Sequence, residues 1–326
     1  MEDVIRTQTF NCPTVEEYGS VLSDSLGGYS VQLSEGSFSA HTNIAYSMNA
    51  VVLRVLISAA SQSYGHIPPG FVAFGIPDKK TRELGRYWNS AHEDDAIVFC
   101  PGGGEVDLLL PQESVIVAAA IKEDVFREVF ERLSGREWPD YENAHRFLRI
   151  SNGARPPLGN SLDKLLRELT DEKNGNGEFL ETTLINSIAS AIPNTVDFKL
   201  PSSKRGDLVE RAIFLAKSSN FKRPLSAICL DLGCSRKLLE IAFQDCKGCS
   251  PSQYLKVLRL NYCRELLLHA NPSESKVSEI AESVGLKWSG YFAAQYNDFF
   301  GEFPKQTLNR HFPSHTQRPI MSPDPS

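Results

Sequence analysis

The chain has 326 residues, of which 41% are hydrophobic and 23% charged, and its mean hydropathy is −0.26. This composition is typical of a globular protein with room for two domains or more. No run of 18 apolar residues occurs, and the first residues are polar and acidic without an apolar signal core. We therefore predict neither a membrane span nor secretion, and expect a cytoplasmic protein with no membrane partner.

Charge is distributed unevenly along the chain, whose net charge is −6. Residues 201–326 hold 17 Lys and Arg against 12 Asp and Glu, a net of +5, whereas residues 1–200 hold 17 against 28, a net of −11. An acidic module joined to a basic one is typical of a protein whose basic part binds nucleic acid. The seven scattered cysteines predict reduced thiols rather than a disulfide framework.

The N-terminal part alternates short strand-like segments with Gly and Pro turns. Strands are predicted over 29–33, 37–40, 51–57, 71–76, 96–100, 106–110 and 114–121. Helices are predicted over 122–133, 160–170 and 177–191. Several short strands with regular turn signals indicate a barrel or a sandwich. The apolar stripes of the helices must then be buried against that barrel or sandwich, or against a second subunit.

The rest of the chain is predicted to be a linker, a helical domain and a tail. The segment 193–206 holds two prolines, a Ser pair and a basic end, and predicts a linker after a domain that covers 1–192. Residues 207–312 have helical periodicity, broken briefly at Gly and Pro. The tail 313–326 holds four prolines and is predicted to be disordered. The fold class is therefore α+β.

The helical domain contains one pattern twice, at 224–245 and at 276–301. In each copy an apolar helix is followed by a Gly, Gly233 or Gly285, which supplies the positive φ of a tight turn between helices. Ser235 and Ser289 stand where a hydroxyl can cap the next helix. Between the copies, Ser-Pro starts a spacer helix that runs to His269, roughly 28 Å at about 1.5 Å per residue. One turn of B-DNA is about 34 Å, so this spacer can hold two recognition helices in successive major grooves.

This domain resembles the DNA-binding domain of the AraC/XylS family of transcription regulators. The matching residues run in order through about a third of the chain: Leu225, Ile228, Gly248 to Pro251, Tyr254-Leu255, Arg259-Leu260, Arg264, Leu266-Leu267, Val277, Glu279 to Ala281, Gly285-Leu286, Ser289, Tyr291-Phe292, Phe299 to Gly301, Pro304 and Phe312. The resemblance implies sequence-specific binding of double-stranded promoter DNA and activation of transcription with RNA polymerase. It also implies a β-rich, cupin-like N-terminal domain that binds a small-molecule effector and makes the protein a homodimer.

The two recognition helices supply the predicted DNA contacts. The predicted residues are Ser235, Arg236, Lys237 and Glu240 in the first helix, and Lys287, Trp288, Ser289, Gln295 and Asn297 at the second. Arg can recognise guanine in the major groove, whereas Lys more often contacts phosphate. Two alternatives stay open, because Arg236 and Lys237 can be solvated surface and Trp288 can pack in the core. Ala293-Ala294 departs from the family, where an Arg is common, so we expect the second helix to contact mainly the DNA backbone.

One basic run in the acidic domain predicts an effector site. It contains Lys79, Lys80, Arg82, Arg86 and Trp88. Guanidinium groups form paired hydrogen bonds with phosphates and stack on planar rings. Arg82 and Arg86 resemble the Arg-x-x-x-Arg motif with which PilZ domains bind cyclic di-GMP, although the partner motif of those domains has no clean copy here. We therefore expect an anionic effector, with cyclic di-GMP as the candidate.

Three alternatives to that effector are open: a sugar or other metabolite as the effector, an N-terminal domain that only dimerises, and a basic loop that pairs with the nearby acidic residues 93–95. The histidines of this domain, His41, His66 and His92, are isolated in sequence and predict no metal site. No nucleophile-base pair is apparent either. We expect neither a cofactor nor enzymatic activity.

Overall fold

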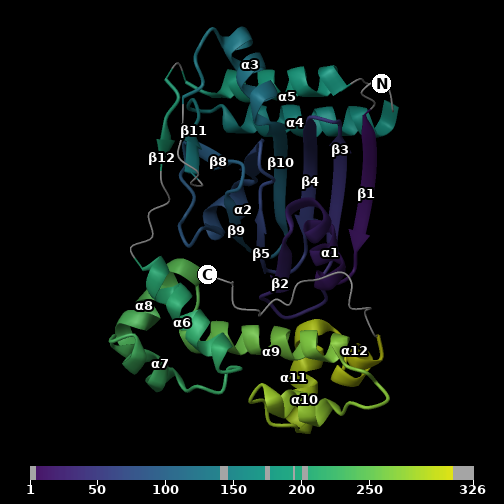
Figure 1. The fold of residues 1–326 in the computed structure, drawn as a ribbon, viewed down its shortest axis with the longest axis vertical. Coiled ribbons are helices and arrows are strands. Elements are labelled where there is room, and N and C mark those ends of the chain that lie inside the picture. Colours follow the sequence, from purple (N-terminus) through teal and green to yellow (C-terminus); the bar gives the residue numbers. More distant parts are fainter. Residues whose placement is uncertain (1–4, 140–145, 173–176, 194, 200–204, 311–326) are drawn as a thin grey trace.

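The computed structural model describes residues 5–139, 146–172, 177–193, 195–199 and 205–310. A β-rich N-terminal part with helices lies at one end of the long axis, and an all-helical C-terminal part lies at the other (Figure 1). The predicted α+β fold class is confirmed. Within the described ranges, no helix has the length and apolar character needed to cross a membrane. The predicted tail, 313–326, and part of the linker, residues 194 and 200–204, lie outside the described residues.

The larger sheet has eight antiparallel strands in the order β1-β3-β4-β10-β6-β8-β11-β12. Their bounds are Arg6–Cys12 (β1), Ala40–Tyr46 (β3), Ala50–Ile57 (β4), Phe71–Pro77 (β6), Ala96–Cys100 (β8), Ser114–Lys122 (β10), Arg146–Arg149 (β11) and Phe198–Lys199 (β12). Side chains alternate between the two faces, so Val117, Ala119 and Ile121 of β10 share one face, on which they join a single apolar core. Ile116 points to the opposite face and joins a different cluster.

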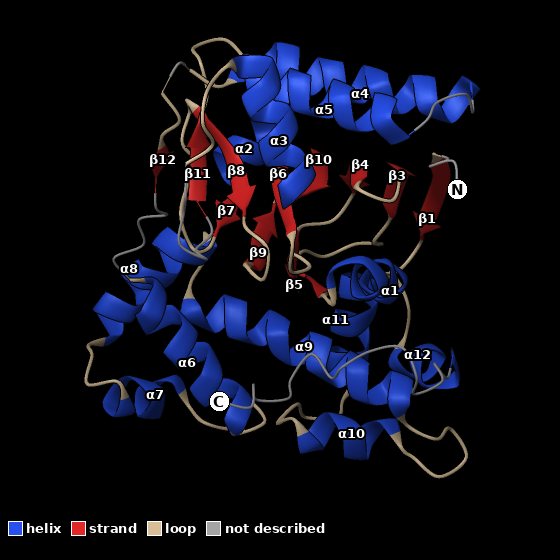
Figure 2. Cartoon of the chain, turned by 45° about the horizontal axis from the view of Figure 1, so that its top comes forward, coloured by secondary structure: helices blue, strands red, loops and turns tan. Residues whose placement is uncertain are grey.

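Three helices cover the first of these faces: α3 (Glu123–Ser134), α4 (Arg155–Glu172) and α5 (Gly177–Ala191). Figure 2 shows them as a layer above the strands. Their buried apolar side chains, such as Leu162, Leu166 and Leu184, form one core with the strands. Trp138, which is 1% exposed, closes that core against Phe126 and Phe130. The predicted helices therefore bury their apolar stripes on the sheet.

The smaller sheet packs on the other face of the larger one. Its order is β2-β5-β9-β7, with bounds Tyr29–Gln32 (β2), Ser61–His66 (β5), Arg86–Tyr87 (β7) and Glu105–Leu110 (β9). Leu110 of β9 shares a cluster with Ile57 of β4, and Val106 shares one with Val98 of β8. Two more helices, α1 (Val15–Leu26) and α2 (Lys79–Leu84), lie beside these sheets. The strands are thus a sandwich of two open sheets, which is one of the two predicted architectures.

Several elements of this domain differ from the prediction. The strand expected over 37–40 begins only at Ala40 and runs to Tyr46. Strand β5 (Ser61–His66) has a polar sequence that gave no signal, and its serines are buried between the sheets. Helices α1 and α2 and strands β1 and β11 were also not predicted. Within the predicted linker, Phe198 belongs to β12, because its ring packs on Phe99 and Trp138.

The C-terminal part is a pair of small helical units joined by one long helix. Its helices are α6 (Gly206–Ser218), α7 (Leu225–Asp231), α8 (Arg236–Lys247), α9 (Pro251–His269), α10 (Val277–Ser283), α11 (Gly290–Phe300) and α12 (Pro304–Arg310). Leu255 and Leu258 of α9 join the apolar core of α6 to α8, whereas Cys263 and Leu267 join that of α10 to α12. Helix α9 therefore belongs to both cores and fixes the distance between them.

Candidate nucleic-acid interface

The first helix-turn-helix unit consists of α7 and α8. Gly233, between them, has a φ of +61°, a conformation that residues with a side chain rarely adopt. The Cys234 amide donates to the Cys229 carbonyl oxygen at 3.0 Å, so the turn closes on the end of α7. Ser235 caps α8, since its hydroxyl accepts from the Leu238 amide at 3.2 Å. These contacts start α8 at a defined position and angle relative to α7.

The second unit repeats this arrangement with α10 and α11. Gly285 has a φ of +74°, and the Leu286 amide donates to the Ala281 carbonyl oxygen at 2.9 Å. Ser289 caps α11 by accepting from the Phe292 amide at 3.2 Å. The turn and the cap that the sequence predicts for each unit are therefore both present.

Helix α9 is the spacer between the units. Ser250 and Gln253 form a reciprocal capping box in front of Pro251, which occupies the first helical position. The helix then runs to His269, as the sequence predicts, and its 19 residues span roughly 28 Å at about 1.5 Å per residue. This length is of the order of one turn of B-DNA, about 34 Å. Helix α8 packs on the first half of α9 and α11 packs on its second half, so the spacer links the two recognition helices.

The first recognition helix carries four of the residues predicted to contact DNA. Arg236 is 71% exposed, and its Nε donates to Glu240 Oε1 at 2.9 Å one turn further along. Lys237 is exposed, and Ser235 is the helix cap. A guanidinium paired with a carboxylate in this way is oriented along the helix surface, where it can exchange that carboxylate for a base or a phosphate.

The second recognition helix begins in a less basic surface. Lys287 and Trp288 are exposed before it, whereas Ser289 serves as its cap and Gln295 and Asn297 are half-buried. The Trp288 indole is 42% exposed and lies 5.8 Å from the Phe292 ring, so it both packs on the unit and presents a surface to solvent. Helix α11 itself contains no Lys or Arg.

Sequence reasoning missed a set of exposed apolar side chains on the same helices. Leu238 and Ile241 of α8 are 41% and 38% exposed, and Tyr291 of α11 is 76% exposed. Their positions could have been found from the helical period, because each lies next to a buried position rather than on it.

The N-terminal domain contacts the C-terminal ends of both recognition helices. Arg86 Nε donates to the carbonyl oxygen of Asp245, near the end of α8, at 2.9 Å. At the end of α11, the Gly36 amide donates to the Asp298 carbonyl oxygen at 3.1 Å. Gln32 Nε2 donates to the carbonyl oxygen of Phe299 at 2.8 Å. The capped N-terminal turns, which carry most of the predicted DNA contacts, lie at the opposite ends of these helices.

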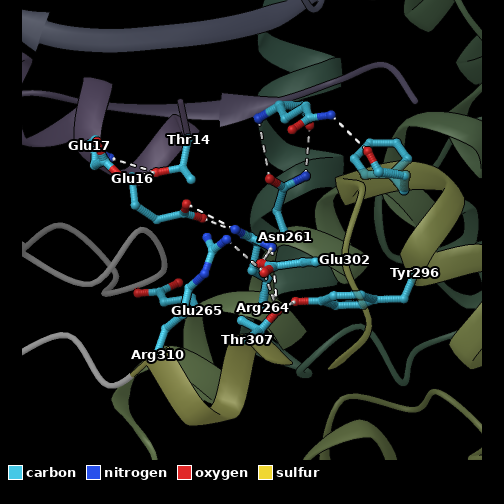
Figure 3. A network of polar contacts seen from close by, with 12 residues as sticks. Thr14, Glu16, Glu17, Asn261, Arg264, Glu265, Tyr296, Glu302, Thr307 and Arg310 are labelled. Atoms are coloured by element: carbon cyan, nitrogen blue, oxygen red, sulfur yellow. Dashed lines mark hydrogen bonds and ion pairs between the residues drawn. The ribbon is translucent and has the colours of Figure 1, made fainter. Parts of the chain in front are cut away.

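A buried polar network joins α1 of the N-terminal domain to the second unit (Figure 3). Arg264 of α9 lies at its centre and is 4% exposed. Its Nε and Nη2 donate to the two carboxylate oxygens of Glu16 at 2.6 and 3.2 Å, and its Nη1 donates to Glu302 at 2.6 Å. Glu302 also pairs with Arg310 at 3.0 Å and accepts from the Thr307 hydroxyl. Two guanidinium groups thus meet the carboxylates of Glu16 and Glu302, and Glu265 belongs to the same network.

Helix α9 is held to the smaller sheet by further hydrogen bonds. The side chain of Asn261 forms two hydrogen bonds with the backbone of Gln32, as an added strand would. Its Nδ2 donates to the Gln32 carbonyl oxygen at 2.7 Å, and its Oδ1 accepts from the Gln32 amide at 3.2 Å. The Tyr254 hydroxyl donates to Gln62. Lys247, at the end of α8, is almost fully buried. Although burial lowers its pKa, the nearby groups of Tyr254, Asp107 and Glu210 outweigh that effect and raise the pKa above its ordinary value. The ammonium group therefore stays charged inside the contact between the domains.

The predicted effector residues do not converge on one space. Arg82 pairs with Asp94 at 2.5 Å and with Glu83 at 3.7 Å, whereas Arg86 points to α8. Lys80 pairs with Glu113 at 2.7 Å, and Lys79 lies exposed beside Glu83. Trp88 is 7% exposed, has a φ of +49° and donates from Nε1 to the Glu105 carbonyl oxygen at 2.9 Å. The ion pair between Arg82 and Asp94 is the kind of contact expected if the basic run is a loop that pairs with the acidic residues 93–95.

Comparison with known proteins supports the helix-turn-helix assignment. A family described as "Helix-turn-helix domain" matches residues 228–310. The probable thc operon regulatory protein of Rhodococcus erythropolis is 34% identical over 89 residues, which are 27% of each chain. The transcriptional activator RhaR of Salmonella schwarzengrund is 28% identical over 156 residues, 45% of this chain and 53% of that protein. The chain thus spans between about a quarter and a half of these relatives.

Among solved structures, a probable AraC family transcriptional regulator from Rhodopseudomonas palustris is 28% identical. That likeness covers 33% of this chain and 99% of the other, with a TM-score of 0.29.

Proposed function

Because the chain belongs to the AraC/XylS family of DNA-binding helix-turn-helix transcription regulators, we propose that it is an activator that binds promoter DNA with α8 and α11 together. As such a regulator it is not an enzyme. The observation that carries the proposal is the pair of capped helices packed on the two halves of α9, a helix of roughly 28 Å at about 1.5 Å per residue, which is of the order of one DNA turn. Activation, with RNA polymerase as the partner, is proposed from the name of RhaR, a transcriptional activator.

The test of DNA binding uses a duplex selected from a random library with the whole chain, followed by titration at fixed salt. Arg236→Ala is expected to weaken binding to that duplex by about 1–3 kcal/mol if the guanidinium contacts a base. Lys79→Ala, an exposed cation of the N-terminal domain, is the matched control and should leave affinity unchanged. An equal loss on random DNA would reduce Arg236 to a phosphate contact. Failure to select any duplex would refute the proposal.

We further propose that the N-terminal domain controls DNA binding through its contacts with the ends of α8 and α11. A ligand that moves Arg86 or the 32–36 loop would change the relative position of the two recognition helices. Such a ligand shifts the equilibrium only by its differential affinity for the two arrangements. Control by a small-molecule effector is therefore supported by contacts that link both helices to one domain.

An anionic effector such as cyclic di-GMP would act at Arg82 and Arg86 by replacing Asp94 and the carbonyl oxygen of Asp245. Binding there would release α8 from the N-terminal domain, so ligand and DNA affinity would be coupled. Calorimetric titration with cyclic di-GMP, beside sugars and other nucleotides, tests this. The proposal requires saturable binding that the double variant of Arg82→Ala and Arg86→Ala abolishes and that Lys164→Ala, at an exposed lysine of α4 outside the basic run, preserves. Absence of binding removes the cyclic di-GMP proposal and leaves DNA binding intact.

A second effector location, for a sugar or other neutral metabolite, is favoured by two hydroxyls between the sheets. Thr42 is 2% exposed and Ser61 is fully buried, and neither hydroxyl has a hydrogen-bond partner among the described residues. Both side chains face the interior of the sandwich, since Thr42 pairs with Val55 and Ser61 with Leu110. A buried hydroxyl without a partner is costly, and a ligand with a matching polar group would remove that cost. Loss of metabolite binding in Thr42→Val would identify this location.

A further inference from the structure

The two recognition helices can be aligned residue by residue from their burial alone. Each ends at a glycine in the left-handed conformation, Gly248 or Gly301, and these stand 53 residues apart. The same offset superposes the buried Leu239 on Phe292 and the buried Phe243 on Tyr296. Positions on the exposed faces of α8 and α11 therefore correspond as well.

Two of the corresponding exposed positions are apolar in both helices. With the offset of 53, Leu238 matches Tyr291 and Ile241 matches Ala294, and all four are exposed. Within each helix the two residues are three apart, so they are neighbours on one face. Exposed apolar side chains that recur at equivalent places in two units indicate a shared function rather than chance exposure.

The charges of the two helices limit how these faces can recognise bases. Helix α11 holds no Lys or Arg, and its single ionisable acid is Asp298. In α8, Arg236 is already paired with Glu240. Base recognition by arginine is therefore absent within α11, although Lys287 lies just before it. Apolar side chains, by contrast, can distinguish one base in the major groove, because thymine alone presents a methyl group there.

We propose that Leu238 with Ile241, and Tyr291 with Ala294, recognise thymine by burying its 5-methyl group, so that each half-site holds an A·T pair at the contacted position. This rests on the proposed DNA-binding function and adds the base that the helices select. It also differs from the sequence-based expectation that α11 contacts mainly the backbone. The structural reason is the exposed pair itself, because Ala294 has no group that can bond a phosphate and the ring of Tyr291 adds an apolar surface beside it.

Replacement of thymine by uracil tests the proposal, because it removes the methyl group and leaves every hydrogen-bonding group of the base in place. The duplex is selected with the full chain, and each thymine of the two half-sites is replaced in turn. Each contacted methyl should cost about fourfold in Kd, from the value of a buried apolar carbon. The DNA alone is altered, so a folding defect cannot mimic the result.

Protein variants assign each methyl to its helix. Ile241→Ala should remove the uracil penalty in one half-site, and Tyr291→Ala should remove it in the other. Leu230→Ala is the matched control, since Leu230 is 81% exposed on α7 of the same first unit and lies outside the recognition helix. This variant should keep the full penalty in both half-sites.

The possible failures are distinguishable. Tight binding to a selected duplex with no uracil penalty at any position would overturn the thymine proposal and leave DNA binding standing. Uracil penalties that persist in Ile241→Ala and Tyr291→Ala would also overturn it. If these variants changed association with another protein chain while uracil had no effect, the apolar faces would be protein contacts. Failure to select any duplex would overturn both proposals.

Discussion

Replacing Glu16 with glutamine tests whether the buried network fixes the N-terminal domain to the second helix-turn-helix unit. Glu16 accepts two hydrogen bonds from Arg264, and the two side chains are 12% and 4% exposed. The replacement keeps the shape and one acceptor but removes the charge. Arg264 would then lose one of the two carboxylates with which it pairs, and the other, Glu302, also pairs with Arg310.

The expected loss in the free energy of unfolding depends on which partners Arg264 keeps in the variant. Removing one partner of a fully buried pair costs about 3–5 kcal/mol, because the remaining charge is left without compensation. Glu302 still lies 2.6 Å from Arg264, and the amide oxygen of glutamine can still accept one hydrogen bond. We therefore expect a smaller loss of about 1–3 kcal/mol in the free energy of unfolding.

Denaturant unfolding of the full chain, read by circular dichroism, measures this loss. The matched control is Glu17→Gln, because Glu17 is the next residue on α1 and accepts from the Thr14 hydroxyl within its own domain. The Glu16 variant should also show an altered affinity for the selected duplex. If both variants lost the same stability to within about 0.5 kcal/mol, the coupling argument would be wrong.

Two further predictions concern pH and backbone conformation. Burial lowers the pKa of His92 to about 4, so the unfolded chain binds a proton below about pH 6.5 that the folded chain takes up only near pH 4. As the pH falls from about 6.5 to about 4, the free energy of unfolding should therefore decrease by about 1–3 kcal/mol. Unfolding measured at several pH values should show a smaller decrease for His92→Phe, and an unchanged decrease would rule out His92 as its source. At the end of α11, Gly301→Ala should cost more than Gly248→Ala in thermal unfolding, because its Cβ would lie 2.7 Å from Ser37 Oγ whereas nothing lies near that of Gly248. Adding Ser37→Ala should remove the excess, and an excess that persists would point to a cause within α11.

The elements of the helical domain could be predicted from the sequence, because they depend on local interactions. Turn glycines, serine caps and the Ser-Pro start of α9 act on the residues next to them, so their positions in the sequence sufficed to predict both units and the full extent of the spacer. The N-terminal domain was predicted less completely. Its strand Ser61–His66 was missed because its sequence is polar, and nothing in that sequence shows that its serines face the interior of the sandwich.

The sequence by itself predicted the helix-turn-helix units, their capped second helices and the length of the spacer helix, because these depend on contacts within a few residues. Tertiary structure decided what the basic run does, since Arg86 contacts α8 at Asp245, 159 residues further along the chain, and Trp88 is buried. It also decided that Arg264 pairs with Glu16 across 248 residues. Such pairings depend on how the two domains pack, and no periodicity in the sequence encodes which distant carboxylate or carbonyl a guanidinium will meet.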